Sequence, residues 1–258
     1  ANAQREHRRQ RVRSGAMTVG FVGYTNAGKS SLFQHLSGKT VLVEDQLFST
    51  LETTVGRMEK SPRILLADTI GFIDNIPNAT LAAFKATIAE AIDADLTLIL
   101  LDTSDSLLEA RRKLETTRRE VFERQEHEPD ALEEARTPHV VLTKVDATTP
   151  QQRQAINDLV IEQGFPKPVA ISSLTGAGIE ELQQFIREQL FGAPVSIHVH
   201  PPTTTSSDAS ERIISSIYDQ GMVEQVRAEA NATVLIVWMT AACQAQLQAR
   251  WGARIDIK

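Results

Sequence analysis

The residues best suited to chemistry in this 258-residue chain lie in one short segment. Residues 23–30 have the sequence GYTNAGKS, which matches the spacing G-x-x-x-x-G-K-[ST] of a phosphate-binding loop. Such a loop presents backbone N–H groups to a phosphate chain, its lysine reaches the terminal phosphates, and the following hydroxyl can bind Mg²⁺. The segment predicts a nucleotide site formed by Gly23, Tyr24, Thr25, Asn26, Ala27, Gly28, Lys29, Ser30 and Ser31, with Ser30 as a metal ligand.

An acidic motif follows at a suitable distance along the chain. Asp68-Thr69-Ile70-Gly71 comes directly after the apolar run 63–67. A carboxylate at the end of a neighbouring strand can hold the Mg²⁺ shell, and the N–H of Gly71 can contact a γ-phosphate. We therefore expect nucleotide contacts from Asp68, Thr69, Ile70 and Gly71, and a catalytic role for Lys29 and Gly71. Without a ligand, the side chain of Lys29 is expected to be exposed to solvent.

Two later segments predict that the base is guanine. Thr143-Lys144-Val145-Asp146 follows the apolar run 139–142, where guanine-binding proteins usually carry Asn-Lys-x-Asp. A carboxylate there accepts hydrogen bonds from the N1–H and the amino group of guanine, which adenine does not offer. A threonine hydroxyl at position 143 can still tie this loop to the phosphate loop. The predicted base contacts, including backbone N–H groups after the last strand, are Thr143, Lys144, Asp146, Ser172, Ser173 and Leu174.

In this order the four motifs resemble those of the translation-factor-related GTPases. Three segments are more specifically similar to the HflX family of ribosome-associated GTPases: GYTNAGKS (23–30), DQLFSTLE (45–52) and DTIGF (68–72). The resemblance implies a cytoplasmic, Mg²⁺-dependent enzyme that converts GTP and water to GDP and phosphate. It also implies a partner, the ribosome, chiefly its large subunit and rRNA, which the protein would split or rescue.

The resemblance also assigns the first switch to residues 39–55. It selects Thr50 as a catalytic group and Mg²⁺ ligand, with further nucleotide contacts from Phe48, Ser49, Thr50 and Leu51. A switch threonine orders its loop only with the triphosphate present. Glu52-Thr53-Thr54 stands where the family usually has Asp-Pro-Thr, which should leave this loop less rigid. Thr53 and Thr54 fit better as part of a following strand than as metal ligands.

Two residues raise the question of how hydrolysis proceeds. Phe72 stands where many GTPases place a water-orienting glutamine, so intrinsic hydrolysis should be slow or use another group. Asn26 leaves two interpretations open. In related GTPases an asparagine at this place can hold K⁺ near the phosphates, whereas asparagine is also an ordinary residue for a left-handed loop backbone.

These motifs require a scaffold in which strands alternate with helices. Short apolar runs predict strands at 18–22, 63–67, 96–101, 139–142 and 168–171. Helical spacing joins Leu81, Phe84, Ile88 and Ile92, then Leu107, Leu114 and Val121, and finally Ile179, Leu182, Ile186 and Leu190. The alternation predicts an α/β P-loop GTPase domain over residues 18–193, with a mostly parallel sheet wrapped by helices.

Residues 194–258 follow a different pattern. An alternating strand, a helix with Ile213, Ile214, Ile217 and Tyr218 on one face, two strand-like runs, a second helix and a last short strand give the order βαββαβ. This order predicts a small α+β domain of the ferredoxin-like kind. His198 and His200 share one face of the first strand, where a solvated strand face is a better interpretation than a metal site.

Charge sets the first residues apart from the rest of the chain. Residues 1–17 hold five arginines and one acid, whereas the whole chain has a net charge of -6. We interpret them as a basic arm that meets an anionic partner such as rRNA, with a solvated helix end as the alternative. The family carries a further N-terminal domain, so a truncated product is expected. A monomer is expected as well.

Composition excludes several classes of protein. No run approaches the roughly 18 apolar residues of a membrane span, so no membrane partner is expected. A single cysteine, Cys243, excludes an intramolecular disulfide. The functional alternatives are a ribosome-assembly GTPase of a neighbouring family, a GTP-gated scaffold with incidental hydrolysis, and a P-loop kinase, against which Asp146 argues.

Overall fold

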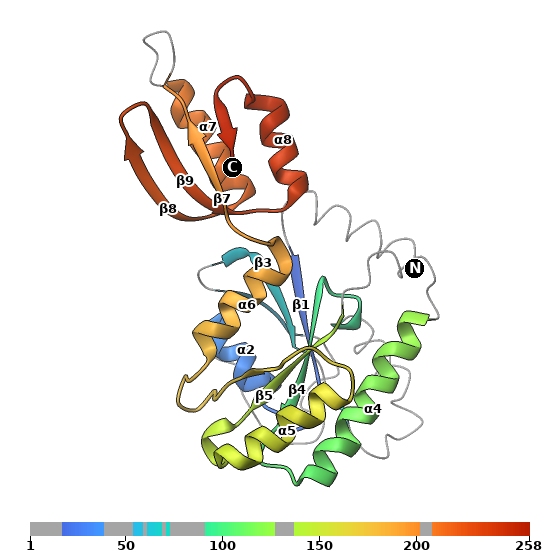
Figure 1. Cartoon of the computed structure of the whole chain (residues 1–258). Coiled ribbons are helices and arrows are strands. Elements are labelled where there is room, and N and C mark those ends of the chain that lie inside the picture. The colour runs from blue at the N-terminus through green and yellow to red at the C-terminus, as the bar shows by residue number, and fades with distance from the viewer. Residues whose placement is uncertain are drawn as a thin grey trace. The chain divides into compact units, whose positions relative to one another are not determined.

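The computed structural model describes residues 17–38, 54–58, 61–68, 71–72, 91–126, 137–201 and 208–258. The chain divides into two compact units, the larger mainly from residues 18–185 and the smaller from residues 186–258 (Figure 1). This division falls at 185/186, within a helix. The predicted limits of the arm and of the two domains, at 17/18 and 193/194, remain predictions.

The larger unit is built on a sheet with the strand order β2-β3-β1-β4-β5-β6. The pairs β1–β4, β4–β5 and β5–β6 are parallel, which confirms the predicted α/β class. The strands span Met17–Val22 (β1), Thr54–Met58 (β2), Ser61–Asp68 (β3), Leu96–Asp102 (β4), His139–Thr143 (β5) and Val169–Ala170 (β6). Thr54 opens β2, as expected of a strand residue.

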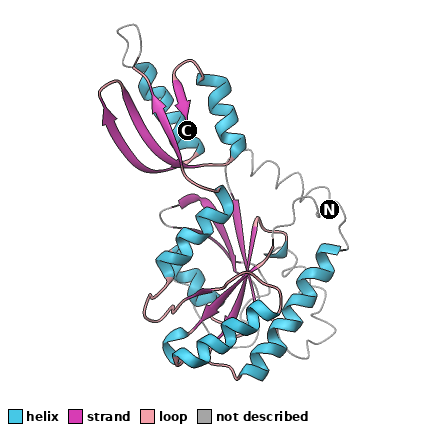
Figure 2. Cartoon of the chain, in the orientation of Figure 1, coloured by secondary structure: helices cyan, strands magenta, loops and turns pink. Residues whose placement is uncertain are grey.

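Helices cover both faces of this sheet, which explains why its central strands are buried throughout and mostly apolar. Every residue of β1 and β4 is buried. Figures 1 and 2 draw α2 and α6 on one side of the sheet and α4 and α5 on the other. The described helices are α2 (Lys29–Ser37), α4 (Leu107–Glu126), α5 (Pro150–Glu162) and α6 (Ile179–Phe191).

Helix α4 follows its predicted face only in part. Leu114 and Val121 are buried, but Leu107 is 47% exposed. Leu107 is the first residue of α4, at the end of the predicted face. Residues Leu81, Phe84 and Ile88 lie outside the described part of the chain, whereas Ile92 is buried.

Helix α5 is not among the helices predicted above, although Ile156, Leu159 and Val160 have the spacing of one helical face and are buried. A capping box marks its start. The Thr149 hydroxyl accepts a hydrogen bond from the Gln152 N–H at 3.3 Å, and the Gln152 side chain accepts one from the Thr149 N–H at 2.9 Å. Pro150 occupies the start of the helix, where its missing N–H costs nothing. Starting signals in the sequence could therefore have located α5.

The smaller unit has the predicted ferredoxin-like arrangement. Its strand order is β10-β7-β9-β8, and the pairs β10–β7, β7–β9 and β8–β9 are antiparallel. The elements span Val195–Val199 (β7), Asp208–Gln220 (α7), Met222–Glu229 (β8), Ala232–Trp238 (β9), Ala241–Trp251 (α8) and Ile255–Ile257 (β10). Its core includes Ile197, Ile213, Leu235 and the free thiol of Cys243.

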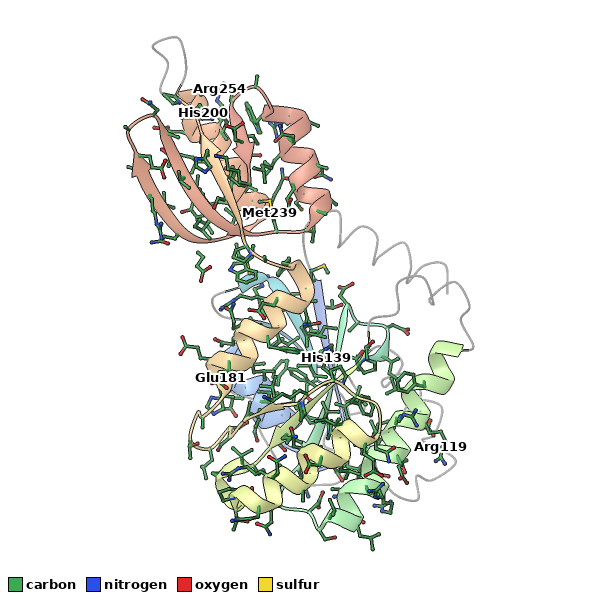
Figure 3. All side chains as sticks on the ribbon, in the orientation of Figure 1. Arg119, His139, Glu181, His200, Met239 and Arg254 are labelled. Carbon is green, nitrogen blue, oxygen red and sulfur yellow. The ribbon has the colours of Figure 1, made fainter. Side chains whose placement is uncertain are left out.

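Polar contacts complete the smaller unit. His200 Nε2 lies 2.8 Å from a carboxylate oxygen of Asp256, and Arg254 donates to the His200 carbonyl at 3.2 Å (Figure 3). Tyr218, predicted to share the apolar face of α7, is 51% exposed, because only the Ile213–Ile217 stripe faces the sheet. None of the helices in the described ranges is long and apolar enough to cross a bilayer.

Candidate nucleotide-binding site

The phosphate loop runs from the end of β1 to the first residue of α2. Gly28 precedes this helix with a left-handed backbone, φ 87°, which a side chain would strain. Its carbonyl accepts the first helical hydrogen bond, from Leu32 at 2.9 Å. Asn26 is exposed and also left-handed, at φ 62°. This is the backbone geometry that the loop-former interpretation of Asn26 expects.

Lys29 is where the structure corrects a prediction. Its side chain is not exposed: the residue is only 6% accessible. The ammonium donates hydrogen bonds to the carbonyls of Gly23 at 3.2 Å and Tyr24 at 2.7 Å. Burial lowers the pKa of Lys29 from 10.5 to about 8, and the negative charge of Asp68 partly opposes this. The loop wraps around the ammonium because its own carbonyls are the nearest acceptors.

Gly71 and Phe72 lie directly against the phosphate loop. The Phe72 N–H donates to the Gly23 carbonyl at 2.8 Å, and the Thr25 N–H donates to the Phe72 carbonyl at 3.0 Å. A Cβ atom on Gly71 would stand 2.6 Å from the Thr25 backbone nitrogen and 2.8 Å from the Tyr24 carbonyl carbon, as well as 2.2 Å from Lys29 Nζ. Because the two backbone atoms cannot move aside easily, glycine is required for this close approach. The second motif therefore meets the first at the position of the lysine. The Phe72 ring is buried and has no group that could form a hydrogen bond with a water molecule.

The base loop is tied to the phosphate loop by the residue that departs from the usual pattern. Thr143, at the end of β5, is 2% exposed, and its hydroxyl donates to the Ala27 carbonyl at 2.9 Å. The same hydroxyl lies 3.3 Å from the Leu101 carbonyl. Thr143 thus ties the base loop to the phosphate loop, as predicted for this position.

The two predicted base segments are neighbours. Asp146 is exposed, in the short 3-10 helix η2 (Val145–Ala147), and so is available to a ligand. The Val145 N–H donates to the Ile171 carbonyl at 3.3 Å, which joins this loop to the segment that holds Ser172, Ser173 and Leu174. Ser172 is fully buried and Leu174 is 85% exposed.

Two contacts of the base loops were not predicted from the sequence. Lys144 has a left-handed backbone, φ 56°, and its Nζ lies 2.6 Å from Asp102 Oδ2 at the end of β4. His35 Nε2, in the last turn of α2, contacts the Ser173 carbonyl. The position of Asp102 at the end of a predicted strand is a weak sequence signal for its contact with Lys144. No pattern in the sequence points to the second.

The oxygen donors for Mg²⁺ are present in part. Ser30, the second residue of α2, is half-buried, and Asp68 ends β3 with 7% of its surface exposed. A hydroxyl and a carboxylate are ligands that suit Mg²⁺. The predicted residues Phe48, Ser49, Thr50, Leu51, Thr69 and Ile70 lie outside the described part of the chain.

Comparisons with known proteins agree with the motifs. A family model described as a 50S ribosome-binding GTPase matches residues 18–144. The GTPase HflX of Gluconacetobacter diazotrophicus is 36% identical over 228 residues, which cover 85% of this chain and 48% of that protein. The GTPase HflX of Methanocaldococcus jannaschii is 32% identical over 235 residues, or 90% of this chain and 54% of that one. The chain therefore spans about half the length of these relatives.

A solved structure shares the fold. The GTP-binding protein of Sulfolobus solfataricus, in complex with GDP, superposes with a TM-score of 0.50 and 24% identity, over 72% of this chain and 55% of that one. At this level of identity the likeness concerns the P-loop GTPase fold alone.

The buried ammonium predicts how stability depends on pH. An unfolded lysine keeps its proton up to about pH 10.4, whereas folded Lys29 loses it near pH 8. Between these values the unfolded state binds more protons, so the cost of burying the charge is relieved as pH rises. The free energy of unfolding should rise by up to about 1.4 kcal/mol per pH unit from this group.

The measurement is denaturant unfolding of the nucleotide-free protein from about pH 7.5 to pH 10.5, beside Lys29→Met, which removes the titrating group. The wild-type value minus the variant value should increase over this range. A difference that stays constant with pH would contradict a buried ammonium.

Proposed function

The chain belongs to the HflX family of GTPases, and we propose that it binds GTP and GDP and hydrolyses GTP. The observation that carries this proposal is the convergence of two separate segments, residues 71–72 and Thr143, on the phosphate loop. Gly71 approaches Lys29, Phe72 bonds to Gly23 and Thr25, and Thr143 bonds to Ala27. A phosphate chain and a base bound at this edge of the sheet would be held by residues far apart in the sequence.

The chain's own residues have distinct parts in this reaction. Lys29 leaves the carbonyls of Gly23 and Tyr24 and turns its charge to the terminal phosphates. The Gly71 N–H meets the γ-phosphate. Ser30 and Thr50 would hold Mg²⁺, with Asp68 holding its shell, and the ion would supply positive charge that offsets the charge developing on the phosphates. Phe72 cannot orient water through its buried ring, so another group must assist the attack.

The base specificity rests on Asp146. Asp146→Asn should lower affinity for GTP by about 100-fold or more and raise affinity for xanthosine triphosphate, because the amide donates where the changed base accepts. Isothermal titration calorimetry of each protein with GTP and with xanthosine triphosphate measures both affinities directly. Asp158→Asn, on the exposed side of α5, is the control and should change neither affinity. Unaltered GTP binding by the Asp146 variant would remove the guanine assignment.

The partner that we propose is the ribosome, chiefly its large subunit, with splitting or rescue of stalled ribosomes as the outcome. The family description and the basic arm support this proposal. Five arginines in residues 1–17 can each replace a counterion on rRNA.

Deleting residues 1–14 should weaken ribosome binding. The slope of the logarithm of the binding constant against the logarithm of the salt concentration should also become shallower, by roughly 0.7–0.9 per lost phosphate contact. Co-sedimentation with ribosomal subunits over a salt series, with GDP and with a non-hydrolysable GTP analogue, measures both. Nucleotide affinity should be kept. The same slope with and without the arm favours a solvated helix end. Binding to precursor particles alone favours an assembly GTPase.

We also propose that K⁺ assists hydrolysis, with Asn26 as its ligand. The exposed side chain of Asn26 in the phosphate loop supports this, as does the absence of a polar side chain at position 72. GTP turnover should be faster in potassium than in sodium at equal ionic strength, and Asn26→Ala should abolish the difference. Phe72→Gln should not speed hydrolysis much. Equal rates in both salts, with and without ribosomes, would leave a group from the partner as the source of assistance.

A further inference from the structure

Tyr24 occupies a phosphate-loop position at which binding a nucleotide requires only backbone atoms, yet it carries a large buried side chain. It is 7% exposed. Its carbonyl accepts the 2.7 Å hydrogen bond from Lys29, and its backbone forms an isolated parallel bridge with Phe72. The ring centroids of Tyr24 and Phe72 are 5.9 Å apart, within the range of a favourable aromatic pair. Tyr24 therefore contacts both Phe72, which follows the second motif, and Lys29, which we propose turns to the phosphates.

The other side of the ring faces helix α4. The Arg112 guanidinium carbon lies 5.3 Å from the ring centroid and Lys113 Nζ lies 5.7 Å from it, both within the range of cation–π attraction. Arg112 also approaches the Tyr24 hydroxyl at 3.5 Å. Acids on and before α4 hold these cations: Glu109 bonds Arg112 at 2.6 and 3.0 Å, and Asp105 bonds Lys113 at 2.8 and 2.9 Å.

The space around the ring allows it to shift. A small cavity of about 10 Å³ lies beside Tyr24, between β4 and α4, with Leu101, Leu114 and Thr117 in its lining. This is about the space that one water molecule needs. The cavity lies on the α4 side of the ring, so any small shift of the ring would be taken up between Tyr24 and α4.

From this geometry we propose that Tyr24 is a positioning residue that couples helix α4 to Phe72 and Lys29. The charged first turns of α4 set where the ring lies, and the ring sets where Phe72 and the Lys29 ammonium lie. In the reverse direction, the bound nucleotide shifts Phe72 and Lys29, and the change reaches α4. The proposal rests on the proposed GTP hydrolysis and adds to it a surface, the first turns of α4, that responds to the nucleotide.

The first test separates hydrolysis from binding. Tyr24→Leu should lower kcat by about 10-fold or more, because a small misplacement of reacting groups costs up to about 100-fold. The Kd for GDP should change by less than about 3-fold. Tyr24→Phe keeps the ring and both cation contacts and should restore kcat. Wild-type kcat in Tyr24→Leu, with wild-type GTP hydrolysis established, overturns the coupling and leaves the proposed function intact.

The second test changes α4 without touching the core. Arg112→Gln removes one cation from the ring and should lower kcat while leaving the Kd for GDP unchanged. Arg119→Gln is the matched control, an exposed arginine on the same helix (Figure 3), and should have no effect on kcat. This pair remains informative if Tyr24→Leu does not fold. Equal kcat in both arginine variants contradicts the proposal.

The third test measures the coupling directly. An environment-sensitive fluorophore attached to Leu108→Cys, at a site 80% exposed on α4, should respond differently to GDP and to a non-hydrolysable GTP analogue. Cys243 is buried and should not react. The difference should vanish with Tyr24→Leu and persist with Tyr24→Phe. A probe at Tyr218→Cys, on α7, should not respond in any of these backgrounds. A Leu108 probe that cannot tell the nucleotides apart, in wild-type protein that binds both, overturns the proposal.

Discussion

A buried ammonium group is the constraint on which the site depends. Lys29 is nearly inaccessible, and its charge is held by two carbonyls of its own loop. Removing a charge from water is unfavourable unless other groups replace the lost hydration. The loop therefore closes around the lysine, and Asp68 supplies the nearest negative charge that favours its protonated form. Gly71 then fits against the nitrogen because it has no side chain.

The link between the base loop and the phosphate loop rests on an equally local requirement. Thr143 is buried at the end of β5, so its hydroxyl needs an acceptor, and Ala27 provides one. An asparagine at this position could make more hydrogen bonds than a hydroxyl can. Lys144 adds a second link through Asp102, and His35 adds a third from α2 to the Ser173 carbonyl. Several contacts thus share the task of holding the two base segments at one edge of the sheet.

The contrast between the two sheets explains why chemistry is concentrated in one unit. In the larger unit β1, β4, β5 and β6 run in parallel, so Thr143 and the segments that follow β1 and β6 all leave the sheet at one edge. Ligands bind at such edges because loops and helix N-termini gather there. In the smaller unit the paired strands alternate in direction, and its core of Ile197, Ile213, Leu235 and Cys243 is apolar.

Much of this protein can be derived from the order of its residues. The glycine spacing of residues 23–30, the apolar runs and the βαββαβ order predict both folds, because they depend on backbone conformation and on periods within one element. The tertiary structure alone decides that Lys29 is buried, that Tyr24 lies between Phe72 and α4, and that Lys144 meets Asp102. These contacts join residues from different elements. A lysine in a sequence of 33 acids has many possible partners, and only the packing of helices on the sheet determines which one it meets.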